Sequence, residues 1–149
     1  MCWLCDNPAA TFDDYLEEVV RPTVAVCGFA VQATPWEETV LAYTVGLAGR
    51  GRPELVVTGK RPEDAHDLLA AALAGEEEPS PGQRCDLLVG TALWAFPVIR
   101  PQVLAVAQAL HPGARALQLL WADTSGRWPW EVHRSPQRLL CDVTQVRAA

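Results

Sequence analysis

The chain has 149 residues, half of them apolar, which is enough to form one domain around a single hydrophobic core. Its 12 basic and 18 acidic side chains give a net charge of -6, and no Lys/Arg cluster could follow a phosphate backbone, which excludes a typical nucleic-acid partner. No stretch approaches the ~20 apolar residues that cross a bilayer, and the N-terminus does not resemble a signal peptide. We therefore expect a cytoplasmic protein with no membrane partner, whose five cysteines stay reduced.

The first predicted element is a helix that begins at Thr11. Acidic residues follow Thr11, and apolar side chains recur at the spacing of one helical face, at Phe12, Tyr15, Leu16, Val19 and Val20. Pro22 interrupts this pattern, so we expect a helix that kinks near residues 18–21 and ends at Gly28. The next three apolar runs are short, rich in Val, Leu and aromatic residues and separated by turn residues, which predicts strands over 29–34, 40–47 and 54–59.

The second half of the chain predicts further helices and strands around one flexible loop. Pro62 begins a helix over 61–75, and the acidic, proline-containing segment 76–83 is typical of a flexible loop. Strands are expected over 84–90 and 93–99, with Pro97 placing the second strand at an edge or at its own end. The rest predicts a helix over 101–113, a strand over 114–123, a turn over 124–127, an irregular aromatic segment and an irregular tail over 132–149.

The order of these elements is not a regular βαβ alternation. The predicted fold class is therefore α+β: a single domain over residues 1–149, with a mixed or mostly antiparallel sheet of about five or six strands. About three helices are expected to pack on one face of this sheet.

The leader, residues 1–10, contains Cys2-x-x-Cys5, and this spacing lets two thiolates bind one zinc ion at about 2.3 Å each. Two further ligands would have to come singly from Cys27, Cys85, Cys141, His66, His111 or His133. A redox pair would need the motif after a strand and at a helix N-terminus, and removal of Met1 would make Cys2 an N-terminal nucleophile. The alternative to all three is that both cysteines pack beneath the first helix as small apolar groups.

The segment WADTSGRWPWE, residues 121–131, holds three of the six tryptophans beside acidic and basic residues. Indole faces near carboxylates and a guanidinium predict a ligand site, for which the candidates are Tyr43, Trp121, Asp123, Arg127, Trp128 and Trp130. The alternative is a rigid aromatic lid on the core. Arg50 and Arg52 lie in a glycine-rich turn, which indicates either an anion site or a hairpin-like connection between neighbouring strands.

Three functional hypotheses follow from these residues. The leading one is a small binding or accessory protein whose small-molecule ligand or protein partner contacts residues 121–131 and Tyr43. The second is a thiol- or metal-dependent enzyme that acts on a small molecule through Cys2 or Cys5, with Glu131 or His133 transferring protons. The third is a homodimer whose exposed tryptophans form the subunit contact.

Several segments together resemble a family of small bacterial proteins, common in actinobacteria, described as domain of unknown function 4262. They are MCWLCD, GFAVQ, AYTVGL with PELVVTG, and ALQLLWAD, GRWPWE and QRLL; the most specific are residues 43–47 with 53–55, and 126–130. The resemblance spans nearly the whole chain and implies a single cytoplasmic domain, without any catalytic residue to carry over. Relatives often have a histidine shortly after the Pro-Val pair, where this chain has Ile99 and Arg100, so no role is expected from that histidine here.

Overall fold

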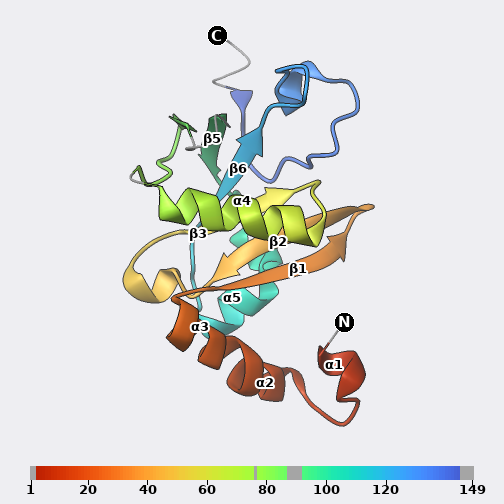
Figure 1. Cartoon of the computed structure of the whole chain (residues 1–149), viewed down its shortest axis with the longest axis vertical. Helices are drawn as coiled ribbons and strands as arrows, with labels where there is room; N and C mark the ends of the chain where they lie inside the picture. The colour runs from red at the N-terminus through yellow and green to blue at the C-terminus, as the bar shows by residue number, and fades with distance from the viewer. Residues whose placement is uncertain (1–2, 76, 87–91, 145–149) are drawn as a thin grey trace.

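The computed structural model describes residues 3–75, 77–86 and 92–144, which form a six-stranded mixed sheet with helices packed on it (Figure 1). The strand order is β1-β2-β3-β6-β5-β4. Neighbouring strands are antiparallel except β3 and β6, which are parallel. The strands are β1 (Ala30–Trp36), β2 (Thr39–Val45), β3 (Glu54–Thr58), β4 (Gln83–Asp86), β5 (Ala92–Pro97) and β6 (Ala116–Trp121). The predicted α+β fold with a mixed sheet is confirmed.

The N-terminal part of the chain is helical and contains the expected irregularity. After α1 (Trp3–Asp6), the chain forms α2 (Phe12–Tyr15), a π-helical segment over Leu16–Val20 and α3 (Arg21–Cys27) without a break. Thr11 and Asp14 exchange backbone and side-chain hydrogen bonds at the start of α2, and these bonds lower the pKa of Asp14. The π-helical segment ends at Val20, two residues before Pro22, which lacks an N–H group, and Gly28 ends α3 at φ +87°.

Helices cover both faces of the sheet, so the expectation that they share one face is wrong. The helix α4 (Pro62–Ala74) packs on one face, with Leu55 and Val57 of β3. The short helix α5 (Ala105–Leu110) and the π-helical segment pack on the opposite face, with Val56 (Figure 1). Every residue of β3 is buried, which requires cover on both sides of the strand. The sequence does not indicate that both faces of β3 are covered, because Glu54 and Thr58 are polar residues on one of these faces.

The connection between β5 and β6 is less helical than expected. Residues Pro101–Val103 form a 3₁₀ turn, and Leu104 leaves the helical conformation before α5 begins. The side chain of Gln108 holds this connection together, because its Nε2 donates to the carbonyl of Ala114 at 2.8 Å and its Oε1 accepts from the amide of Gly113 at 3.1 Å. Pro97 is the last residue of β5, and β5 lies inside the sheet, so the proline lies at the strand's end rather than at an edge.

The described part of the tail is irregular but firmly attached to the face opposite α4. Gln118 of β6, which is completely buried, donates through Nε2 to the carbonyl of Arg138 at 2.7 Å and accepts through Oε1 from the amide of Leu140 at 2.7 Å. The hydroxyl of Thr58 donates to the same carbonyl at 2.9 Å and accepts from the amide of Arg138 at 2.8 Å. Side chains of the sheet therefore replace a neighbouring strand as hydrogen-bond partners of this segment.

Some expectations concern residues that the structure does not describe. Glu76 of the predicted flexible loop, residues 87–90 of the predicted strand over 84–90, residue 91 and residues 145–149 of the tail lie outside the described residues. Within the part that is described, no helix combines the length and the apolar character needed to cross a membrane.

Candidate functional site

The turn within the tryptophan-rich segment is closed by its own polar side chains. The Oδ1 atom of Asp123 accepts from the amides of Ser125 and Arg127, both at 2.9 Å, and its Oδ2 atom lies 3.3 Å from the Nε atom of Arg127. These interactions lower the pKa of Asp123, the amide of Arg127 contributing most. Asp123 and Arg127, expected to contact a ligand, thus already stabilise the turn.

The Trp-Pro-Trp sequence continues as a 3₁₀ turn over Pro129–Glu131. The Oε2 atom of Glu131 accepts from the amide of Trp128 at 2.8 Å, and the amide of Glu131 donates to the carbonyl of Trp128 at 2.9 Å. Pro129 is buried at the first position of this turn, where its missing N–H has no cost. The carboxylate of Glu131 therefore helps to close the turn that contains both tryptophans.

Three half-buried tryptophans form what we call the indole cluster: Trp94 of β5, Trp128 and Trp130. The rings of Trp128 and Trp130 are stacked, with centroids 5.5 Å apart and planes 5° apart, and Trp94 meets Trp128 edge-on at 6.4 Å. The guanidinium carbon of Arg84 lies 5.7 Å from the centroid of the Trp128 ring. Trp94 and Trp130 also pack on a small core that contains Phe96 and Cys141.

Trp121 and Tyr43 lie apart from the indole cluster, although both were expected in the same site. Trp121 packs on the α4 side of the sheet, where the Nζ atom of Lys60 lies 4.0 Å from its ring centroid. Tyr43 is 3% exposed beneath α5, and its hydroxyl accepts from the amide of Val106 at 3.1 Å. Burial raises the pKa of Tyr43. The predicted ligand residues thus occupy three separate places.

His133 lies in a half-open hollow that the sequence did not indicate, and which we call the tail hollow. The hollow has a volume of about 510 Å³ and lies between the turn after β1 and the start of the tail. Its lining residues are Glu38, Pro129, Val132, His133, Arg134, Ser135, Gln137, Arg138 and Leu139. Within the described residues, no hydrogen bond or ion pair joins His133 to Glu131, the other predicted proton-transfer residue. The tail hollow instead combines His133 with two arginines and one glutamate.

The cysteines are dispersed over the structure. Cys5 is exposed on α1, Cys27 is exposed at the end of α3, and Cys85 and Cys141 are buried on opposite faces of the sheet. Burial raises the pKa of Cys141 to about 12, so this thiol stays protonated at neutral pH. Cys2 lies outside the described residues. Among the residues that are described, no group of three or more His, Cys, Asp or Glu side chains could hold a metal ion, and zinc binding at Cys2 and Cys5 stays a prediction.

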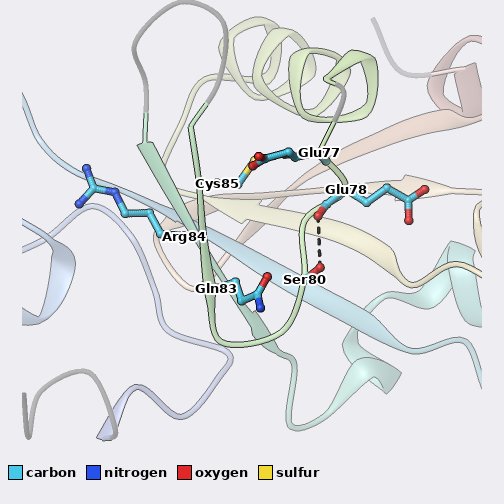
Figure 2. Close-up of a pocket in the computed structure, with 6 residues that line it drawn as sticks. All are labelled: Glu77, Glu78, Ser80, Gln83, Arg84 and Cys85. Atoms are coloured by element: carbon cyan, nitrogen blue, oxygen red, sulfur yellow. Dashed lines mark hydrogen bonds between the residues drawn. The ribbon is translucent and has the colours of Figure 1, made fainter.

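A second hollow, of about 480 Å³, lies between β4 and the loop that follows α4 (Figure 2). Cys85 points toward Glu77 in this view, with its Sγ atom 4.0 Å from the Glu77 carbonyl, whereas Arg84 points to the other side of β4. This alternation along the strand places the guanidinium group of Arg84 near Trp128, although Arg84 is also one of the residues that line the hollow. The acidic groups at the hollow are Glu77 and Glu78, and Glu78 pairs with Arg52 at 3.2 Å.

The sequence analysis missed Glu54, a carboxylate that is 1% exposed at the start of β3. Its Oε2 atom accepts from the hydroxyl of Thr44 at 2.7 Å, and its Oε1 atom accepts from the amides of Gly46 and Ala48 at 2.9 and 3.0 Å. Burial nevertheless raises the pKa of Glu54, because desolvation outweighs these hydrogen bonds. A charged residue inside the apolar run ELVVT, directly after a glycine-rich turn, is the signal that could have identified it.

Comparison with known proteins gives one family. A model described as "Domain of unknown function (DUF4262)" matches residues 23–135. This region contains Glu54 and the tryptophan-rich segment but not Cys2 or Cys5. The family model therefore covers less of the chain than the resemblance in sequence suggested. No curated protein and no solved structure shows a significant match to the chain.

Proposed function

The chain belongs to the DUF4262 family, and we propose that it is a small binding protein whose ligand, a small organic anion, occupies the tail hollow. The observation that carries this proposal is the set of basic side chains, His133, Arg134 and Arg138, around one hollow of about 510 Å³. A hollow of this volume suits a metabolite-sized molecule.

The charge at the tail hollow differs from the charge of the chain as a whole. The chain carries a net charge of -6, yet Glu38 is the single acidic residue among the residues that line this hollow. Neither Arg134 nor Arg138 forms an ion pair with another described residue. Guanidinium groups without a carboxylate partner favour a carboxylate or phosphate ligand, which they can bind through paired hydrogen bonds.

Hydrogen bonds hold the backbone that forms the tail hollow in place without a ligand. The buried side chain of Gln137 accepts from the amide of Trp121 at 3.1 Å and donates to its carbonyl at 2.6 Å. Arg138 is held by Thr58 and Gln118 through its amide and carbonyl. A fixed backbone reduces the conformational entropy that binding would otherwise cost, so it supports a ligand-binding role.

The tryptophan-rich segment contributes Pro129 to the lining of the tail hollow. Stacking of Trp128 on Trp130 fixes Pro129, which lies between them in the sequence and lines the hollow. In this proposal, the tryptophan-rich segment both covers the core and contributes to the binding site, which combines the two alternatives that the sequence left open.

The double variant Arg134→Gln/Arg138→Gln tests the proposal. We expect at least one molecule in a panel of small carboxylates and phosphates to raise the melting temperature of the wild-type protein. Its affinity, measured by isothermal titration calorimetry, should fall at least tenfold in the variant, because charge-assisted hydrogen bonds contribute about 1.5–3 kcal/mol each.

The matched control is Arg61→Gln/Arg100→Gln, which removes the same charge from exposed positions outside the tail hollow. It should bind like the wild type. The proposal is wrong if no anion in the panel binds at millimolar concentration, if neutral analogues bind equally well, or if the two double variants lose affinity alike.

A further inference from the structure

A third hollow lies at the end of the sheet at which the central strands β3 and β6 begin. These two strands are parallel, with Glu54 paired to Ala116, so the loops that lead into them lie side by side. The amide of Glu54 donates to the carbonyl of Arg115 at 2.9 Å and joins the two loops. Between the loops is a hollow of about 160 Å³, which we call the loop hollow.

The ionisable side chains that line the loop hollow are all basic: Arg52 from the loop before β3, and His111 and Arg115 from the loop before β6. Neither His111 nor Arg115 forms an ion pair with another described residue. Arg52 is paired with Glu78 at 3.2 Å, but the side chain of Glu78 is 69% exposed, and an ion pair of this kind is weak.

On each side of the loop hollow, the backbone contains a glycine with free space around it. Gly51 and Gly113 have φ angles of +73° and +83°, and a β-carbon built at either position would meet no atom within 4 Å. Left-handed backbone explains why glycine is favoured there, and the missing side chains leave space for a ligand. A volume of about 160 Å³ is below the range of sites for larger molecules and suits a single oxyanion group.

We propose that the loop hollow is a phosphate site, in which Arg52, His111 and Arg115 bind the oxygens of inorganic phosphate or of a phosphate group on a small molecule. The site shares no residue with the tail hollow, so it does not depend on the function proposed above. Because Glu78 and the phosphate compete for Arg52, the ion pair between Arg52 and Glu78 limits the affinity for phosphate.

Titration of the ¹⁵N-labelled protein with inorganic phosphate tests this site residue by residue. We expect saturable shifts of the backbone signals of Gly51 and Gly113 and of the Nε signal of Arg115, and no such shifts with chloride at the same ionic strength. Arg115→Gln should weaken phosphate binding at least tenfold. The exposed Arg100→Gln should leave it unchanged, and the spectra show whether each variant is folded.

The variant Glu78→Gln distinguishes phosphate binding by Arg52 from a purely structural role of this arginine. Removing this competitor should tighten phosphate binding, by up to about fivefold, because Arg52 is then fully available. The phosphate site is refuted by shifts that do not saturate or that chloride reproduces, by unchanged binding in Arg115→Gln, or by a Glu78→Gln variant that does not bind phosphate more tightly. Shifts centred on Arg134 and Arg138 would also refute it, while leaving the tail hollow as an anion site.

Discussion

Glu54→Ala is expected to lower the free energy of unfolding by roughly 3 kcal/mol, because it leaves one buried and two partly buried donors without their acceptor, and a buried donor in that state costs about 1–3 kcal/mol. The carboxylate of Glu54 accepts from the hydroxyl of Thr44 and from the amides of Gly46 and Ala48. Alanine removes the acceptor for all three at once. The turn between β2 and β3 would lose the group that closes it.

Chemical denaturation of the variant measures this loss, with Glu18→Ala as the control. Glu18 is an exposed glutamate of the N-terminal helical region, so its replacement should change the free energy of unfolding by less than about 0.5 kcal/mol. If Glu54→Ala and Glu18→Ala had the same stability, the hydrogen bonds of Glu54 would contribute nothing to the fold.

The stability of the protein should also depend on pH through Glu54. Burial raises its pKa in the folded state, so the folded protein binds this proton more tightly than the unfolded chain does. This contribution is fully present below the pKa of the unfolded state and is lost as the pH rises through the pKa of the folded state. Relative to Glu54→Gln, which does not ionise, the wild type should become less stable as the pH rises from about 4.5 toward neutrality; a difference of opposite sign would contradict this.

Gly59→Ala is expected to lower the free energy of unfolding by about 2–4 kcal/mol, because it combines backbone strain with a clash that breaks hydrogen bonds. Gly59 has a φ angle of +85°, and a β-carbon there would lie 2.5 Å from the carbonyl oxygen of Pro136 and 2.9 Å from the amide nitrogen of Gln137. Both neighbours are backbone atoms, so the tail must move away from the sheet.

The control for this variant is Gly126→Ala, which introduces backbone strain without a steric clash. Gly126 has a similar φ angle of +78°, but a β-carbon there would meet no atom within 4 Å. Its replacement should therefore cost only the strain of left-handed backbone, about 1–2 kcal/mol. Thermal and chemical unfolding of both variants measure the difference, and equal losses would mean that the tail does not pack against Gly59 as described.

The sequence predicts the elements of this fold better than it predicts their arrangement. Short β-rich runs identify the strands, and Pro62 and Gly28 mark the start of one helix and the end of another. The parallel pairing of β3 with β6 joins residues that are 62 positions apart, such as Glu54 and Ala116, and no local pattern signals it. Glu54 and Gln118 are polar residues in buried strands, so the sequence of these strands does not indicate that both faces of the sheet are covered.

The candidate site was predictable only in part, because neighbours in sequence separate in space. Trp121 ends β6 on the α4 side of the sheet, whereas Trp128 and Trp130 lie after a turn that returns the chain to Trp94. His133 was identified as a candidate, but Arg134 and Arg138 belong to a polar tail without periodicity. Their position depends on side chains of the sheet, such as Gln118, that no spacing rule relates to the tail.

A crystal structure of the protein with the anion that most raises its melting temperature tests the proposed function most directly. The anion should lie in the tail hollow, with its charged group between the guanidinium groups of Arg134 and Arg138 and beside His133. An anion bound on the indole cluster or elsewhere, with the tail hollow empty, would contradict the proposed function.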